Sequence, residues 1–175
     1  MPELYGKGRL LINAMARSDP VHVEHLLDSG AFIRNRSTSH YEKDVQGDII
    51  LFSLGPDTDI DCFKAFVCHS CVCTNLNYQH RLLRTSVPLL EALSLLQSIL
   101  ANLETGFQDG LPPGKLERQR DLIVSKIYAL LDAGADPDKS EYGGSALDIA
   151  KGELANSPND SAVWLPMIAK MESLS

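Results

Sequence analysis

The sequence has no long apolar run and no strong cluster of positive charge. No stretch of 18 or more apolar residues occurs among its 175 residues, so no transmembrane helix is expected. The 16 lysines and arginines are outnumbered by 23 acidic residues, which gives a net charge of -7. The one locally basic stretch, KLERQR (115–120), contains a glutamate. Because nucleic acids and anionic membranes are bound mainly through lysine and arginine, we expect neither as a partner.

Short motifs of catalysis and cofactor binding are also missing. The chain contains no Gly-x-Ser-x-Gly, P-loop, Gly-x-Gly-x-x-Gly or His-Glu-x-x-His sequence. The spaced aspartates of DPDKSEYGG (136–144) lack the glycine and the glutamate of a calcium-binding loop. We therefore expect no enzymatic activity and no cofactor.

Cysteine is scarce and confined to one place. The stretch CFKAFVCHSCVC (62–73) holds all four cysteines. Secreted disulfide frameworks usually spread their cysteines along the chain, so we expect an intracellular protein, cytoplasmic or nuclear. The first twenty residues show no cleavage-like small-residue site and are better interpreted as a helix.

Two distant segments of the chain repeat each other. VEHLLDSGAFIRN (23–35) and IYALLDAGADPDK (127–139) share Leu-Leu-Asp, a small residue and Gly-Ala. Each pattern predicts an amphipathic helix that ends at a glycine, Gly30 or Gly134. Glycine suits this position because it adopts the left-handed conformation without the strain of a Cβ atom.

A second pattern lies upstream of these helices. RLLINA (9–14), VPLLEA (87–92) and SALDIA (145–150) each have leucine at the third position and alanine at the sixth. We expect the leucines to pack inward and the alanines to allow close helix contact. Ser145 and Asp148 have the spacing of a capping box.

The stretch LLDAGADPDKSEYGGSALDIAK (130–151) resembles the join between two ankyrin repeats. Ala146 and Asp148 depart from the Thr-Pro-Leu-His-x-Ala motif of that family. The resemblance implies one domain, an all-α solenoid of about four ankyrin-like helix-turn-helix repeats. The units are about 8–40, 46–80, 85–139 with an insert at 94–120, and 144–175.

Two segments need further interpretation. The insert at 94–120 predicts two lengthened helices with a projecting hairpin at 104–116 rather than a separate domain. GDIILFSL (47–54) is compatible with a helix or a strand, because short apolar runs are ambiguous. The repeat register favours the helix.

The cysteine-rich stretch can be aligned with the first repeat, 23–35. This register places Ser70 at the position of the closing glycine. Cys71 and Cys73 then occupy buried positions, a common use of cysteine, and Cys68 faces solvent. The interpretation makes the cluster the second helix and closing turn of a degenerate repeat.

Two chemical alternatives use the same cluster. A metal-stabilised domain would draw its ligands from Cys62, Cys68, Cys71, Cys73 and His69. Structural zinc usually needs two pairs of closely spaced ligands separated by a loop, and the second pair is missing here. A thiol-regulated domain would use Cys-x-x-Cys at a helix C-terminus, where the helix dipole disfavours thiolate. Both remain alternatives to the packing interpretation.

The ankyrin resemblance implies a non-catalytic module for protein–protein interaction through its concave face and repeat arms, with no identity for the protein partner. Such repeats also occur in secreted effectors, for which the host cell would be the location.

A third alternative is a self-associating unit that forms an oligomer through 94–131. Phe52 is expected to be an exposed aromatic that needs a cover. The candidate partner-binding residues are Tyr41, Tyr78, His80, Arg81, Lys139, Glu141 and Tyr142.

Overall fold

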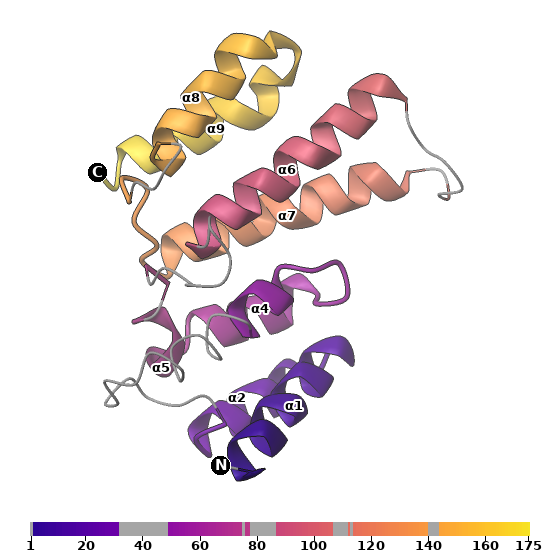
Figure 1. The fold of residues 1–175 in the computed structure, drawn as a ribbon, viewed down its shortest axis with the longest axis vertical. Helices are drawn as coiled ribbons and strands as arrows, with labels where there is room; N and C mark the ends of the chain where they lie inside the picture. The colour runs from indigo at the N-terminus through magenta and orange to yellow at the C-terminus, as the bar shows by residue number, and fades with distance from the viewer. Residues whose placement is uncertain are drawn as a thin grey trace.

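The computed structural model describes residues 2–31, 49–74, 76–77, 87–106, 112, 114–139 and 144–175, with side chains from residue 8 onward (Figure 1). Every regular element in these ranges is a helix, which confirms the all-α class. The stretch 49–53, for which a strand was the alternative, is helical. In the same ranges, no helix is long and apolar enough to cross a membrane.

The helices follow one another as hairpin-like pairs along the chain. A short turn separates the members of the first pair, whereas longer connections separate one pair from the next. In chain order the elements are α1 (Pro2–Ala16), α2 (Pro20–Asp28), the helical stretch 49–53, α4 (Ile60–Val67), α5 (Ser70–Cys73), α6 (Pro88–Thr105), α7 (Lys115–Asp132), α8 (Ala146–Asn156), the 3₁₀ turn η1 (Pro158–Asp160) and α9 (Ser161–Glu172).

The pairs stack in sequence order from the N-terminus to the C-terminus (Figure 1). The second helices make one row, in which α2 contacts α4, α4 contacts α7 and α7 contacts α9. On the other side of the stack, α6 contacts α8. Each predicted unit contains one of these pairs. Their assignment as ankyrin-like repeats stays a prediction.

The third pair is longer than the others. Helices α6 and α7 span 18 residues each and extend beyond the ends of the neighbouring pairs (Figure 1). Gly106 ends α6 in the left-handed conformation, with φ of 65°. The predicted lengthened helices are therefore present. Part of the hairpin between them lies outside the described residues.

Helix ends follow the chemistry of their residues. The side chain of Ser145 accepts a hydrogen bond from the Asp148 N–H, and the Asp148 carboxylate accepts one from the Ser145 N–H, both at 3.1 Å. This is the predicted capping box. Gly30 and Gly134 both close their helices with positive φ, 82° and 95°. These two predictions are confirmed.

The predicted closing turn at Ser70 is wrong. Ser70 is the first residue of the one-turn helix α5, and it follows His69 in an extended conformation. Ser18, after α1, does adopt the left-handed conformation, with φ of 56°, whereas Ser70 does not. The Nδ1 atom of His69 accepts the Cys71 N–H at 3.3 Å and caps the new turn.

One continuous apolar core runs through the stack. The repeated leucine pairs of α2 and α7 are buried, as are all three alanines of the upstream pattern. Of the three leucines of that pattern, Leu11 and Leu89 are fully buried and Leu147 is half-buried against the core. Trp164 of α9 is also fully buried. The repeated apolar positions therefore predict most of the packing.

We expect Gly134→Ala to lower the free energy of unfolding by about 1 to 2 kcal/mol, because alanine is strained at positive φ. A Cβ atom at Gly134 would meet nothing within 4 Å, so the cost is conformational. The matched control is Gly152→Ala inside α8, where a Cβ atom also meets nothing within 4 Å. This change should raise stability by about 0.5 to 1 kcal/mol. Urea unfolding measures both, and shifts of the same sign would contradict the expectation.

Candidate functional site

The four cysteines do not share one environment. Cys62 and Cys71 are buried, Cys73 is half-buried, and Cys68 is exposed. Cys68 meets solvent and Cys71 is buried, both as predicted, whereas Cys73 was predicted to be buried and is only partly buried against the core. The side chains therefore follow the packing interpretation, although the backbone turn differs.

The cysteine thiols of α4 are held in their protonated form. Burial raises the pKa of Cys62 to about 12, and the charge of Asp59, which accepts the Cys62 N–H at 2.8 Å, adds to the rise. Cys68 lies at the C-terminal cap of α4, where burial, followed by the charge of Asp132, also raises its pKa. Because the thiolate is the reactive form, neither residue is prepared as a nucleophile.

His69 lies between two helix pairs. Its Nε2 atom is 3.1 Å from a carboxylate oxygen of Asp28 at the end of α2, and its Nδ1 atom is 3.0 Å from the sulfur of Cys71. Nδ1 also accepts the Cys71 N–H, so the Nε2 atom carries the proton that is donated to Asp28. Within the ranges that the structure describes, no three side chains of His, Cys, Asp or Glu are placed to hold a metal ion.

Lys126 is the one fully buried charged side chain among the described residues. From α7 its Nζ atom donates hydrogen bonds to the carbonyl oxygens of Ser53, at 2.9 Å, and Gly55, at 2.7 Å. The same atom lies 5.3 Å from the centre of the Phe63 ring, within the range of a cation–π contact. Lys126 thus binds the chain at the C-terminal end of the helical stretch 49–53, where the carbonyl of Ser53 is beyond the reach of further helix N–H groups and the carbonyl of Gly55 also accepts the Thr58 N–H at 3.4 Å.

The burial of Lys126 changes its acidity. Burial lowers the pKa of this amine to about 8, while the carboxylates of Asp59 and Asp57 act in the opposite direction. No substrate reaches Nζ, because the side chain is fully enclosed. The amine therefore acts as a clasp that holds the loop after residue 53 against α7, rather than as a catalytic group.

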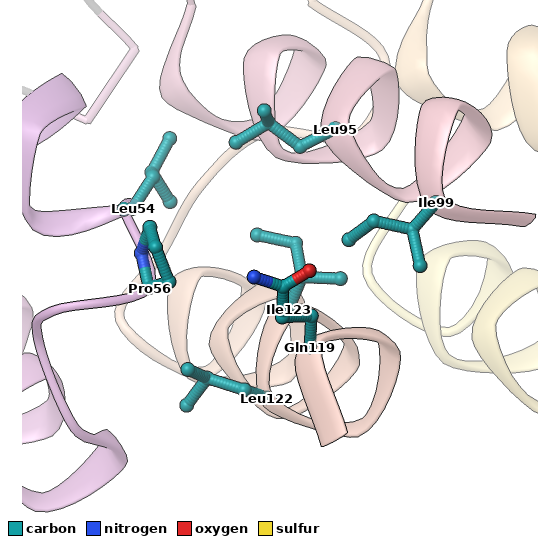
Figure 2. A pocket seen from close by; sticks show the side chains of 8 residues that line it. Leu54, Pro56, Leu95, Ile99, Gln119, Leu122 and Ile123 are labelled. Atoms are coloured by element: carbon teal, nitrogen blue, oxygen red, sulfur yellow. The ribbon is translucent and has the colours of Figure 1, made fainter. Parts of the chain in front are cut away.

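An apolar groove lies next to this clasp (Figure 2). One wall comes from the loop that Lys126 holds, and the others come from the middle of α6 and the first half of α7. Its volume is about 190 Å³, which compares with a cavity of roughly 150 Å³ that accepts benzene. It therefore has room for one aromatic or branched side chain. The lining residues are Leu54, Gly55, Pro56, Leu95, Ile99, Gln119, Leu122 and Ile123.

The groove continues into a polar depression at the start of α7. Pro56, Gln119 and Leu122 line both, so the two are contiguous. The other residues of the depression are Lys115, Arg118 and Asp57. An apolar pocket with a charged rim is the usual anatomy of a protein-binding surface.

Of the predicted partner-binding residues, the structure describes Lys139, which is exposed. Phe52 is 41% exposed, as expected. The groove itself was not predicted, because the helical spacing of Leu95 and Ile99 does not show which apolar side chains stay exposed. Leu95 is in fact 37% exposed. Six predicted partner-binding residues lie outside the described ranges: Tyr41, Tyr78, His80, Arg81, Glu141 and Tyr142.

Comparison of the chain with protein-family models, curated proteins and solved structures gave no match. The ankyrin resemblance therefore depends on the residues of the sequence alone.

We expect the stability of the wild type, relative to Lys126→Met, to rise between about pH 8 and pH 10.5. In this window the folded chain has released the Lys126 proton and the unfolded chain still holds it. Since the unfolded state then binds more protons, stability increases with pH, by at most about 3 kcal/mol before solvent screening is subtracted. Urea unfolding across this range measures the difference, with exposed Lys64→Met as the control. A stability difference between the wild type and Lys126→Met that does not change with pH would contradict the burial of a charged amine at this position.

Thiol labelling should follow the exposure of the cysteines. We expect N-ethylmaleimide to modify Cys68 first, and Cys62 only when the chain unfolds, because the Cys62 thiol is enclosed and protonated. Mass spectrometry of the labelled peptides measures the order, and Cys68→Ser should remove the fast site. Equal rates at the two cysteines would contradict this packing. Stoichiometric zinc in the purified protein would instead support the metal alternative.

Proposed function

We propose that the protein is a non-catalytic protein-interaction module, a solenoid of about four ankyrin-like helix pairs that binds a partner protein. The observation that carries the proposal is the apolar groove between the loop 54–56, the middle of α6 and the first half of α7 (Figure 2). The site is displaced from the repeat arms that the sequence suggested. The arms remain candidates for additional contacts.

The groove has the properties of an anchor site. Its lining is apolar except for Gln119, and two of its walls come from α6 and α7, which pack against each other. Burying one leucine or phenylalanine side chain stabilises a complex by about 1.5 to 3 kcal/mol. Anchors of this kind, seated in a pocket and surrounded by a polar rim, dominate many interfaces. Small-molecule sites usually add several convergent polar groups, which this lining does not provide.

The reactive side chains of the described residues support a non-catalytic role. Lys126 is enclosed by its two carbonyl partners and the Phe63 ring. His69 is engaged by Asp28 and Cys71. These groups stabilise contacts between neighbouring helix pairs, and the groove lining offers no nucleophile or general base.

A displayed library of random peptides, selected on the full chain, tests the proposal. We expect peptides that bind the wild type and lose at least tenfold in affinity to Leu95→Asp, because a carboxylate in the apolar groove must be desolvated on binding. The matched control is Leu165→Asp on α9, where the leucine is 54% exposed and remote in the stack.

Circular dichroism and thermal unfolding verify that both variants remain folded. Binding that is equally strong in the two variants, or a selection without any peptide sensitive to Leu95→Asp, would reject the groove as the interaction site. Concentration-dependent self-association that Leu95→Asp abolishes would assign the groove to a second copy of the chain instead.

A further inference from the structure

We propose that the segment bound in the groove is acidic as well as apolar, with one or two carboxylates beside the side chain that fills the pocket. This inference rests on the proposed function and specifies the partner. It follows from the charges at the rim of the groove and from their order along α7.

Two positive side chains at the rim have no ion-pair partner in the part of the chain that the structure describes. Lys115 and Arg118 line the polar depression, and neither forms an ion pair within the described residues. Arg120, two residues further along α7, is already paired with Asp121 at 2.8 Å. In a chain with a net charge of -7, an unpaired positive pair next to an apolar groove favours a negatively charged partner.

The nearby carboxylate does not cancel this charge. Asp57 also lines the depression, but it interacts electrostatically with the ammonium group of Lys126 beneath the loop. Glu117 is half-buried, one of its carboxylate oxygens is enclosed, and it is absent from the lining of the depression. The surface that a ligand would contact therefore carries the two positive charges of Lys115 and Arg118 and one carboxylate, Asp57, whose charge is partly balanced by Lys126.

The order of these side chains along α7 sets the pattern of the ligand. Lys115, Arg118, Gln119, Leu122 and Ile123 follow helical spacing and share one face of α7. This face is basic at the start of the helix and apolar two turns later. Seven residues of helix span about 10 Å, so the carboxylate and the apolar anchor of the ligand should lie about 10 Å apart. That separation corresponds to about three residues of an extended peptide or two turns of a helix.

An acidic peptide fits this surface better than a polyanion. Nucleic acids are bound through many phosphate contacts, whereas the rim offers two cations. The apolar groove next to the rim would stay empty against a phosphate backbone. In an acidic–apolar peptide the groove would supply most of the affinity, and the two cations would supply orientation, selectivity and association rate.

Sequencing the peptides selected on the full chain gives the first test. We expect enrichment of a leucine, isoleucine or phenylalanine with an aspartate or glutamate at the spacing above. The second test measures the affinity of a selected peptide for Lys115→Glu/Arg118→Glu by fluorescence anisotropy, with an expected loss of about tenfold and a weaker dependence on salt. The reversed charges lie in the first turn of α7, where acidic residues favour the helix.

Two matched comparisons make these results specific. Arg17→Glu/Lys64→Glu changes the net charge by the same amount at exposed positions away from the groove, and should leave the affinity unchanged. A peptide in which lysine replaces the acidic residues should bind Lys115→Glu/Arg118→Glu more tightly than it binds the wild type.

The outcomes separate the two proposals. Peptides that are sensitive to Leu95→Asp but carry no acidic residue, or that bind the charge-reversed variant as tightly as the wild type, would overturn the acidic partner and leave the groove as a binding site. A selection without any peptide sensitive to Leu95→Asp would overturn both. Displacement of a selected peptide by DNA at physiological salt would assign the rim to nucleic acid.

Discussion

The junction between the second and third helix pairs is built around one buried lysine side chain. Lys126 joins the second helix pair to the third through the carbonyls of Ser53 and Gly55, and its position against the Phe63 ring adds a third contact from α4. Removing a lysine amine from water is costly, and hydrogen bonds to the Ser53 and Gly55 carbonyls offset part of that cost. The loop after residue 53 is thereby held at a fixed distance from α7, and this distance defines the groove.

The other polar contacts of the core region serve the same purpose. The contact between Asp28 and His69 connects the first pair to the turn after α4. Asn77 connects the second pair to the turn after α7, because its side chain accepts the Asp136 N–H at 2.7 Å and donates to the Gly134 carbonyl at 3.1 Å. Side chains that could carry chemistry in another setting are used here between neighbouring pairs. The exposed surface at the groove is consequently left with apolar contacts and simple charges.

Local patterns in the sequence predict the helices, but not the contacts that bring them together. The glycines after α2 and α7, the capping box at Ser145 and the exposure of Cys68 all follow from neighbouring residues. The closing turn predicted at Ser70 was wrong because an alignment assigns positions in a repeat and carries no information on the backbone conformation that a particular residue adopts. Lys126 interrupts an apolar stripe of α7, and this interruption was the one sequence pattern that could have indicated a buried lysine. Its carbonyl partners lie 71 and 73 residues earlier, a separation that periodicity does not encode.

The row of second helices has a consequence for the way in which the molecule comes apart. Contacts run from α2 to α4, α7 and α9 in order, so the free energy of the fold resembles a sum of terms for each pair and for each junction between pairs. The first and last pairs have one junction each, whereas the middle pairs have two. Hydrogen exchange at the two ends can then proceed by local opening, while the junction that contains Lys126 opens only with the centre of the stack. We therefore expect the groove to lie in the part of the chain that opens last.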